Sequence, residues 1–338
     1  MEISILGAGT WATAIARLLS DKYKVLIYAR NIEDVNNIND LHSNKKYFPD
    51  IVLSDKIRAS NDLEEIFKNK YIVNAIPTQA VRSVLEKSKD FVKKDHIFIN
   101  LSKGLELKTH LRISEIFKEI VPQATYTILS GPSHAEEVIE NIPTAVVCAC
   151  EDEKIAEDIQ DIFFRDYFRV YSSKDVVGVE LGGAIKNVLA FCIGMATGLK
   201  YGDNTKAAIM TRGIHEMSKF ALSQGADIKT INGLAGVGDL IVTATSMHSR
   251  NNRAGILVGE GYTVEEACEK IHMVVEGIPT TKAIYELAKQ LDIELPITNE
   301  LYKVLYQGKD PKESVICLMN RDRKSEFWLW QLKRILTK

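Results

Sequence analysis

The sequence predicts an α/β protein, in which an N-terminal domain with a doubly wound, mainly parallel sheet is followed by an all-helical C-terminal domain. The first half of the chain alternates short apolar runs with amphipathic helical stretches, which is typical of a parallel sheet covered by helices. From about residue 175 onwards, only helical runs follow one another. A length of 338 residues also favours two domains over a single core. We therefore expect one domain over residues 1–178 and a second over residues 179–338.

Six runs of four to six residues in the first half are rich in Ile, Val, Tyr and Phe, and each is predicted to be a mostly buried strand. These runs are Glu2–Leu6, Lys24–Tyr28, Tyr71–Ile76, His96–Leu101, Tyr126–Leu129 and Ala145–Ala149. The helical patterns between them cover Thr10–Ser20, Leu63–Lys68, Gln79–Val92, Leu111–Ile120 and Ile155–Phe164. We interpret the Asn-rich stretch Asn31–Asn44 as a surface helix and loop.

The second half contains nine predicted helices, which glycines punctuate. They are Val176–Leu199, Lys206–Gln224, Ile228–Ile231, Gly238–Thr245, Arg250–Gly259, Thr263–Lys270, Thr280–Leu291, Ile297–Leu305 and Pro311–Leu318. One more amphipathic helix is predicted over Phe327–Leu336, because Trp328, Leu332 and Ile335 recur on one face. We expect it to pack on its own domain, with a subunit contact and a transient membrane contact as the alternatives.

The composition is that of an ordinary soluble globular protein, with 46% hydrophobic and 26% charged residues. A net charge of −2 gives no global attraction to nucleic acid or to an anionic membrane. The most apolar run, Val176–Leu199, carries Glu180, Lys186 and several glycines, which argues against membrane insertion. Five cysteines without a CxxC motif and a first strand without a preceding basic segment predict a cytoplasmic protein. The oligomeric state stays open, a homodimer included.

Two glycines, Gly7 and Gly9, stand between the first predicted strand and the first predicted helix. Gly7 permits a tight turn, and Gly9 lets a pyrophosphate approach the N–H groups at the helix N-terminus. Ala12 occupies the third glycine position of this fingerprint, where alanine is tolerated. We predict a Rossmann-like dinucleotide-binding domain, with Thr10 and Trp11 as further cofactor contacts. A plain tight turn is the alternative.

The end of the second predicted strand indicates which dinucleotide binds. NAD enzymes usually carry Asp or Glu there, which holds the ribose hydroxyls. In this chain the strand is followed by Ala29 and Arg30, and no carboxylate occurs before Glu33. The planar guanidinium of Arg30 suits a 2′-phosphate. We predict NADPH as the cofactor, with NADH use not excluded and a solvated Arg30 as the alternative.

Six further motifs follow one another along the chain, and they carry a family resemblance. They are Ser102–Glu106, Ser130–Ala135, Leu181–Asn187, Gly236–Leu240, Ser249–Asn251 and Val275–Gly277. Together with the N-terminal glycines, this set resembles the bacterial NAD(P)-dependent glycerol-3-phosphate dehydrogenases, over nearly the whole chain. The resemblance implies interconversion of dihydroxyacetone phosphate and sn-glycerol 3-phosphate by hydride transfer. It also implies a supply of glycerol 3-phosphate for phospholipid synthesis.

Lys186 is the predicted catalytic residue. Its neighbours on all sides of the predicted helix are apolar, among them Ile185, Val188 and Leu189, and we therefore expect the amine to be buried. Burial disfavours the ammonium form and lowers the pKa towards neutrality, which a general acid and base near pH 7 needs. The resemblance assigns the same role to Lys186 and places it at the substrate. A lysine whose stem is buried while its amine reaches solvent is the alternative.

Four more residues of the second half, besides Lys186, are predicted to bind substrate. By resemblance, Asp239 lies near Lys186 and the substrate hydroxyls, although it could also cap the helix that follows Gly238. A phosphate needs cations and N–H donors, and Ser249, Arg250 and Asn251 open a predicted helix, where anions are favoured. The resemblance brings these three to the glycerol phosphate and Arg250 also to the cofactor. A solvated basic turn is the alternative.

The remaining predicted contacts rest mainly on the resemblance. Lys103 follows the strand His96–Leu101 at its carboxyl end, where open parallel sheets bind ligands, and it is expected to contact both cofactor and substrate. An exposed loop lysine is the alternative. The next strand end carries Gly131 and Ser133 for the substrate and Ala135 for the cofactor, unless this is merely a structural turn around a proline. The last two cofactor contacts implied are Val274 and Glu276, the latter of which could equally be a surface charge.

No metal is predicted, because hydride transfer with a lysine acid needs none and the histidines show no paired ligand spacing. Two other functions stay open. One is another two-domain hydroxyacid reductase of the ketopantoate or hydroxyisobutyrate type, which would lack a phosphate-binding cluster. The other is an NADPH-binding sensor that has lost catalysis.

Overall fold

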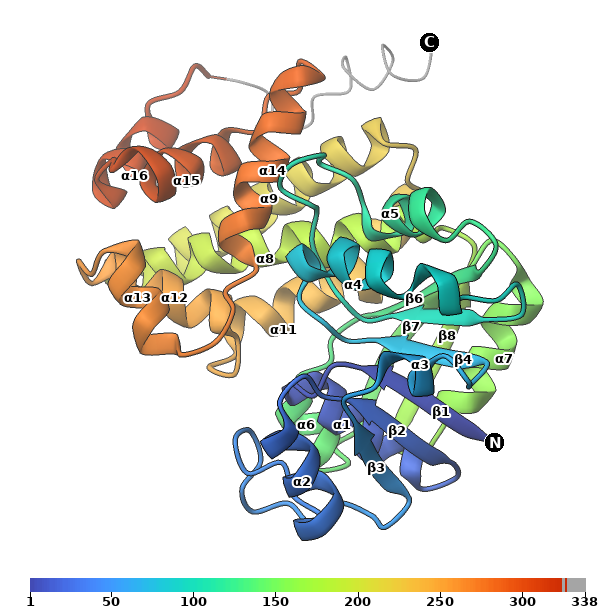
Figure 1. Ribbon diagram of the computed structural model, residues 1–338. Helices are drawn as coiled ribbons and strands as arrows, with labels where there is room; N and C mark the ends of the chain where they lie inside the picture. The colour runs from blue at the N-terminus through green and yellow to red at the C-terminus, as the bar shows by residue number, and fades with distance from the viewer. Residues whose placement is uncertain (324–325, 327–338) are drawn as a thin grey trace.

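The computed structural model of the chain describes residues 1–323 and residue 326. Its N-terminal half contains an eight-stranded sheet with the strand order β3-β2-β1-β4-β5-β6-β7-β8 (Figure 1). Neighbouring strands are parallel except β6 and β7, which pair antiparallel. The strands are β1 Glu2–Leu6, β2 Lys24–Tyr28, β3 Ile57–Ser60, β4 Tyr71–Asn74, β5 Ile97–Asn100, β6 Thr125–Ser130, β7 Thr144–Ala149 and β8 Phe168–Ser173. The predicted doubly wound, mainly parallel sheet is confirmed.

The sequence prediction missed β3 and β8, which are the two edge strands of the sheet. In β3 only Ile57 and Ala59 are buried, and in β8 only Phe168 and Val170. An edge strand of this kind alternates buried and solvent-facing residues. Neither strand therefore contains the continuous apolar run that marks the central strands.

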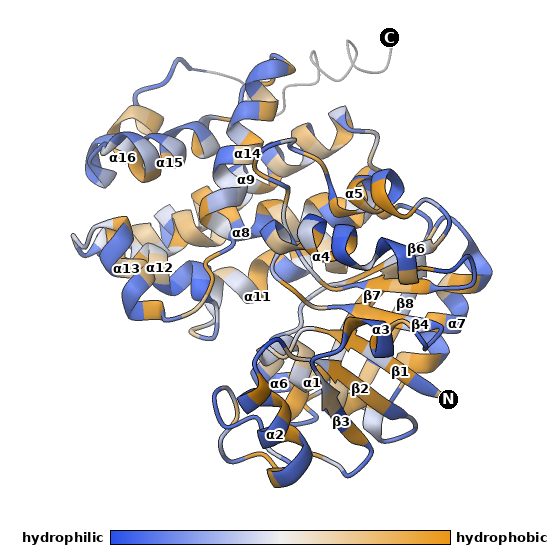
Figure 2. Cartoon of the chain, in the orientation of Figure 1, coloured by the Kyte–Doolittle hydropathy of each residue, from blue (hydrophilic) through white to orange (hydrophobic). Residues whose placement is uncertain are grey.

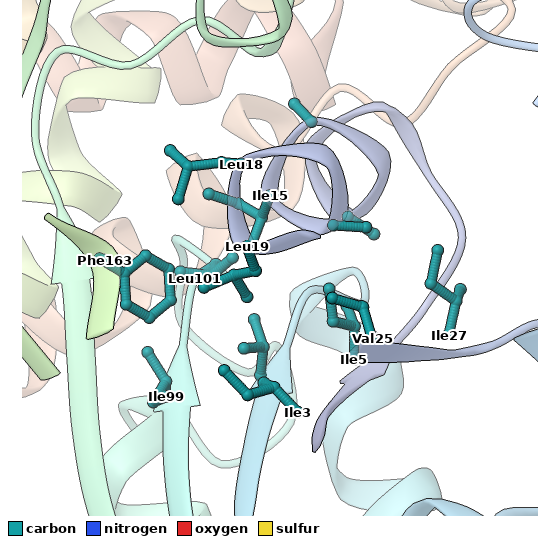
Figure 3. Close-up of a cluster of buried hydrophobic side chains, with 14 of the residues drawn as sticks. Ile3, Ile5, Ile15, Leu18, Leu19, Val25, Ile27, Ile99, Leu101 and Phe163 are labelled. Carbon is teal, nitrogen blue, oxygen red and sulfur yellow. The ribbon is translucent and has the colours of Figure 1, made fainter. Parts of the chain in front are cut away.

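Helices cover both faces of the sheet. On one face, Ile3, Ile5 and Val25 lie beneath apolar side chains of α1 (Figure 3). Residues of α6 and α7 belong to the same hydrophobic cluster. On the other face, Leu6 and Phe98 pack against α3, α4 and α5. Figure 2 shows the hydrophobic strands between helices whose outer turns are hydrophilic. These helices are α1 Thr10–Ser20, α2 Ile32–Leu41, α3 Leu63–Ile66, α4 Val81–Ser88, α5 Ile113–Ile120, α6 Ala135–Ile139 and α7 Glu153–Phe163, with 3₁₀ turns η1 Thr78–Ala80 and η2 Lys89–Phe91.

The second half of the described chain is helical, as predicted, and it is organised around α8 (Figure 1). Helices α9, α11, α12 and α14 all pack on α8. By length and composition α8 could cross a membrane, but 89% of its most apolar stretch is buried inside the protein, and it is the core helix of this half. The elements are α8 Val176–Gly198, α9 Asp203–Ser223, α10 Ile228–Ile231, the π-helical turn η3 Leu234–Gly238, α11 Asp239–Thr245, α12 Arg250–Gly259, α13 Val264–Ile271, α14 Gly277–Gln290, α15 Pro296–Gln307 and α16 Pro311–Met319.

Two expectations are not tested. The division between residues 178 and 179 falls within the first turn of α8, and it stays a prediction. The helix predicted over Phe327–Leu336 lies outside the described residues.

The topology also determines where a ligand can bind. Because β1, β4, β5 and β6 run parallel, their carboxyl ends lie along one edge of the sheet. The loops that leave this edge begin at Gly7, Ala75, Leu101 and Gly131, and α8 packs against β6 beside them. In open α/β sheets ligands bind at the carboxyl edge, where the chain leaves in opposite directions on either side of β1.

Candidate active site

The turn between β1 and α1 is closely packed at one glycine and open at the other. Gly7 has a φ of 111°, and a Cβ at this position would stand 3.0 Å from the carbonyl oxygen of Ala75. No atom lies within 4 Å of the place that a Cβ of Gly9 would occupy. Thr10 and Trp11 form the first turn of α1 directly behind this space. The turn therefore fits a dinucleotide, because it leaves room for a pyrophosphate at the N-terminus of an 11-residue helix.

Arg30 lies between the end of β2 and the start of α2, with its side chain exposed. The N-cap of α2 is Asn31, whose Oδ1 accepts the N–H of Glu33 at 3.0 Å. The guanidinium is therefore outside the helix and is placed at the carboxyl edge of the sheet. Its contact with a 2′-phosphate stays a prediction.

Lys186 lies inside the protein. Only 7% of the residue is exposed, and its Nζ donates to Asp239 Oδ1 at 2.5 Å and to Thr243 Oγ1 at 2.8 Å. Asp239 and Thr243 lie one turn apart on the same face of α11 and so meet the amine together. The alternative of an amine that reaches solvent is therefore wrong. So is the alternative that Asp239 serves only as a helix cap, because its carboxylate binds lysine.

A second lysine shares the same carboxylate. Lys103, in the loop after β5, donates from Nζ to Asp239 Oδ2 at 2.6 Å and to the carbonyl oxygen of Gly131 at 3.2 Å. Its side chain is 15% exposed, whereas that of Asp239 is 1% exposed. When Lys186 is protonated, two ammonium groups thus flank one buried carboxylate, which leaves a net positive charge where β5, β6, α8 and α11 meet. Such a centre is suited to an oxygen that gains negative charge.

Burial and nearby charges together shift the pKa values of Lys186 and Asp239. Burial lowers the pKa of Lys186 to about 7, the charge of Asp239 opposes this shift, and the nearby charge of Lys103 reinforces it. Burial alone would raise the pKa of Asp239, but the two lysine charges outweigh it and the pKa falls below its usual value. Asp239 is therefore ionised near neutral pH, while Lys186 is divided between its ammonium and amine forms. A group of this kind can both give and take a proton.

A chain of amide side chains connects this centre to α14. Asn187, next to Lys186, donates from Nδ2 to the carbonyl oxygen of Lys103 at 3.5 Å and accepts from Asn251 Nδ2 at 2.9 Å. Asn251 Oδ1 in turn accepts the N–H of Gly277 at 2.8 Å. The side chain of Asn251 thus has two partners within the protein. Its predicted contact with the substrate stays a prediction.

Glu276 joins the two halves of the chain. Its Oε1 accepts the N–H of Thr78, from the loop after β4, at 3.0 Å, while its Oε2 is buried without a partner among the described residues. Burial raises the pKa of Glu276, and the Thr78 N–H and the charge of Arg250 oppose the rise. Glu276 is therefore not a surface charge, and its free oxygen is a candidate acceptor for a cofactor donor. Val274, by contrast, is 49% exposed.

The remaining predicted contacts lie on two turns. In the loop after β6, Ser133 Oγ donates to the carbonyl oxygen of Gly131 at 2.9 Å, and Ala135 begins α6. At the start of α12, Ser249 Oγ accepts the N–H of Asn252 at 3.2 Å and caps the helix. Arg250 is partly exposed in the first turn of that helix. The Gly131 carbonyl, which Lys103 also contacts, links the first turn to the lysine pair.

Sequence reasoning missed the polar network beneath Lys103. Asn74 Nδ2, at the end of β4, donates to Asn100 Oδ1 at 2.7 Å, and Asn100 Nδ2 donates to the carbonyl oxygen of Ser102 at 3.0 Å. Both asparagines are fully buried at the strand ends and fix the backbone that carries Lys103. In the sequence, Asn74 and Asn100 lie near the ends of the two apolar runs Tyr71–Ile76 and His96–Leu101. These two positions were the available signal. Within the described part of the chain, no three His, Cys, Asp or Glu side chains are grouped so that they could hold a metal.

Comparison with known proteins matches both halves of the chain. Residues 2–156 match the N-terminal part, and residues 175–316 the C-terminal part, of the family described as NAD-dependent glycerol-3-phosphate dehydrogenase. The chain belongs to this family. The predicted family, its oxidoreductase activity and its dinucleotide cofactor are thereby confirmed.

Several relatives are similar over almost their whole length. A glycerol-3-phosphate dehydrogenase [NAD(P)+] of Clostridium acetobutylicum is 47% identical over 328 residues, which cover 96% of this chain and 99% of the relative. A glycerol-3-phosphate dehydrogenase [NAD(P)+] from a Thermoanaerobacter species is 48% identical over 329 residues, which cover 97% of this chain and 99% of the relative. The crystal structure of a glycerol-3-phosphate dehydrogenase from Coxiella burnetii superposes with a TM-score of 0.92 at 34% identity, over 95% of this chain and 99% of that one. A ketopantoate reductase from Ralstonia eutropha, at 13% identity and a TM-score of 0.60, shares the fold.

Proposed function

We propose that the chain reduces dihydroxyacetone phosphate to sn-glycerol 3-phosphate, and catalyses the reverse reaction, with Lys186 as general acid and base. The turn at Gly7 and Gly9 would hold NADPH, or NADH, which would supply a hydride for reduction of the carbonyl carbon. The observation that carries the proposal is the buried amine of Lys186, which shares Asp239 with Lys103 and has a pKa of about 7. In reduction the Lys186 ammonium donates a proton to the carbonyl oxygen. In oxidation the neutral amine accepts the hydroxyl proton.

The other groups of the centre have distinct tasks in this proposal. Asp239 holds the Lys186 ammonium in position and offsets the cost of burying its charge. Lys103, held between Asp239 and the Gly131 carbonyl, stabilises negative charge on the substrate oxygen as the carbonyl is reduced. The N-terminus of α12 and the Arg250 guanidinium bind the phosphate, because N–H donors and a cation suit a dianion. Ser249, Asn251, Gly131 and Ser133 complete the substrate contacts.

Substitution of Lys186 by Met tests the catalytic role. We expect turnover of dihydroxyacetone phosphate to fall by about 10²- to 10⁴-fold, the usual contribution of general acid–base catalysis. The dissociation constant for NADPH, measured by nicotinamide fluorescence, should change less than about twofold, because Lys186 is assigned to the substrate and not to the cofactor. Lys174→Met is the matched control, since Lys174 is an exposed lysine paired with Glu153. Retained turnover, or an equal loss of NADPH affinity, would contradict the acid–base role.

A substrate comparison tests the reaction. Activity on dihydroxyacetone phosphate should exceed activity on unphosphorylated dihydroxyacetone and on ketopantoate, because a helix N-terminus and a guanidinium are assigned to the phosphate. Higher activity on a non-phosphorylated acid would favour a hydroxyacid reductase. Binding of NADPH without turnover of any ketone phosphate would favour a sensor.

The cellular setting is part of the proposal. The cysteines are free thiols, three of them buried and two less buried. Free thiols are typical of a reducing environment, which supports a cytoplasmic location. There the enzyme would supply glycerol 3-phosphate for phospholipid synthesis. We also propose a homodimer without membrane insertion, which light scattering of the purified chain and its partition between cytosolic and membrane fractions would test.

A further inference from the structure

His134 is a partly buried residue that the mechanism does not use. It lies between Ser133 and Ala135 in the loop after β6, and its carbonyl oxygen accepts the N–H groups of Glu137 and Val138 at 3.1 and 3.0 Å. His134 is the N-cap of α6, and its backbone is therefore held by the helix start. The direction of its side chain is determined by the same turn that carries Gly131 and Ser133.

The imidazole of His134 reaches α11 and the segment that follows it. Its Nε2 lies 3.3 Å from the carbonyl oxygen of Val242, which also accepts the N–H of Ser246 at the end of α11. Its ring packs against the ring of His248, with 5.8 Å between centroids and 56° between planes. One side chain thus contacts both α11, at Val242, and the segment that joins α11 to α12, at His248.

One contact lies directly beside a residue that binds the Lys186 amine, and the other lies directly beside a proposed substrate contact. Val242 precedes Thr243, which binds the Lys186 amine, and His248 precedes Ser249, which caps α12. Through its N–H, His134 therefore fixes the helix that carries Asp239. Through its ring, it fixes the turn that leads into Arg250.

Burial and the charge of Lys186 favour the neutral imidazole of His134. Burial lowers the pKa of His134 and the charge of Lys186 lowers it further, while the hydrogen bond with the Val242 carbonyl and the charges of Glu136 and Glu137 oppose the shift only in part. A neutral ring carries one N–H, and the carbonyl at Val242 places that hydrogen on Nε2. The His134 side chain thus acts as a directed hydrogen-bond donor and as a packing surface.

We propose that His134 and His248 form a positioning pair that sets the separation between the Gly131–Ala135 turn and the Ser249–Asn251 turn, and with it the affinity for the phosphorylated substrate. This inference rests on the proposed function. A three-carbon phosphate must reach from the carbonyl beside Lys186 to the donors of α12, and these groups come from different elements. A change in the separation of the two turns would weaken phosphate binding while leaving the lysine centre and the cofactor turn in place.

Two variants separate the two contacts. His134→Phe keeps a ring beside His248 but removes the N–H donor, whereas His248→Ala removes the ring contact and keeps the donor. His248 is exposed, and its replacement by Ala therefore leaves folding intact. His215→Phe is the control, because His215 is an exposed histidine on α9 for which the described residues offer no hydrogen bond. His134→Gln, which retains an N–H donor, tests rescue.

The readout is the ratio of kcat/KM for dihydroxyacetone phosphate to that for unphosphorylated dihydroxyacetone, with NADPH affinity measured in parallel. We expect His134→Phe and His248→Ala to lower this ratio at least about fivefold, the scale of one neutral hydrogen bond or ring contact. NADPH affinity should stay within about twofold of wild type, since neither residue is assigned to the cofactor. His134→Gln should recover part of the ratio, and His215→Phe should leave it unchanged.

Two results would contradict the proposed positioning pair. If both variants keep the wild-type ratio, or lose activity on the two ketones and NADPH affinity alike, the positioning pair is overturned. Lys186→Met in the same assay distinguishes a failure of the proposed function. If that variant turned over dihydroxyacetone phosphate normally, the lysine mechanism would be lost, while the ratio measured for the histidine variants would still test the pair.

Discussion

Replacement of Asp239 by Asn should shift the pH profile of the reductive activity to lower pH without changing the form of that profile. The carboxylate accepts hydrogen bonds from Lys186 at 2.5 Å and from Lys103 at 2.6 Å, and it is 1% exposed. Its charge is what keeps the pKa of Lys186 as high as about 7 against burial and against the charge of Lys103. An amide keeps the shape of the side chain but removes that charge. The pKa of Lys186 should therefore fall.

The size of the fall follows from the strength of the lost contact. A hydrogen bond to a charged group contributes about 1.5–3 kcal/mol, and one pKa unit corresponds to about 1.4 kcal/mol. Loss of the carboxylate should thus lower the pKa of Lys186 by about one to two units, to roughly 5–6. At pH 7.5 the ammonium fraction would fall by about 10- to 100-fold. Reduction, which uses the ammonium, should slow by the same factor.

The assay is kcat/KM for dihydroxyacetone phosphate measured between about pH 5 and pH 9. The ammonium is present below the pKa and is lost above it, and the reductive activity of the wild type should therefore decline as pH rises through about 7. In Asp239→Asn the decline should begin one to two units lower. Thr243→Val, which removes a neutral acceptor at 2.8 Å from the same amine, is the control and should shift the decline by less than about one unit. A decline that stays near pH 7 in Asp239→Asn would refute the assignment of this carboxylate.

Four further substitutions test other parts of the site. Arg30→Asp should shift the preference from NADPH towards NADH by about 10- to 100-fold in the ratio of kcat/KM values, because a bond between charged groups is lost; an unchanged ratio would show that Arg30 does not contact the 2′-phosphate. Gly9→Ala should leave the melting temperature unchanged but raise the KM for NADPH about tenfold or more, because the added Cβ would occupy the open space at the helix N-terminus. Gly7→Ala should instead lower the stability of the protein by about 1–2 kcal/mol, because Gly7 has a φ of 111°. Lys103→Met should raise the pKa of Lys186 by removing a like charge, and reduction should then persist to higher pH, the opposite of the Asp239 variant.

The sequence predicts the fold well where a strand is buried on both sides and poorly where it is not. β1 and β2 bury several consecutive residues that are mostly apolar, and their predicted and observed bounds agree. β3 and β8 expose every second residue at the edges of the sheet, and a four-residue strand such as Ile57–Ser60 resembles a loop. Burial on two faces leaves a clear pattern in the sequence, and burial on one face of a short strand does not.

In the site, the sequence predicts what depends on neighbours along the chain, and it does not predict contacts between residues far apart in the chain. That Lys186 is buried could be inferred from its apolar neighbours on one helix, because helical neighbours are set by local geometry. That its partner is Asp239, 53 residues later, could not be inferred from spacing and came only from the family resemblance. The contact between Glu276 and the backbone of Thr78 spans 198 residues, and no pattern in the chain marks Thr78. Tertiary packing alone decides such pairs.

The approach of α8 to the sheet shows why the two halves must fold together for the site to exist. Gly183 lies one helical turn before Lys186, and a Cβ there would stand 2.9 Å from Ser130 Oγ at the end of β6 and 3.4 Å from Cγ of Lys103. Glycine inside a helix costs about 0.5–1 kcal/mol relative to alanine, and α8 accepts that cost where it meets the carboxyl edge. The close approach is what brings the amine of one half within reach of the same carboxylate as the lysine of the other half. A glycine that weakens its own helix thus makes the shared lysine–aspartate centre geometrically possible.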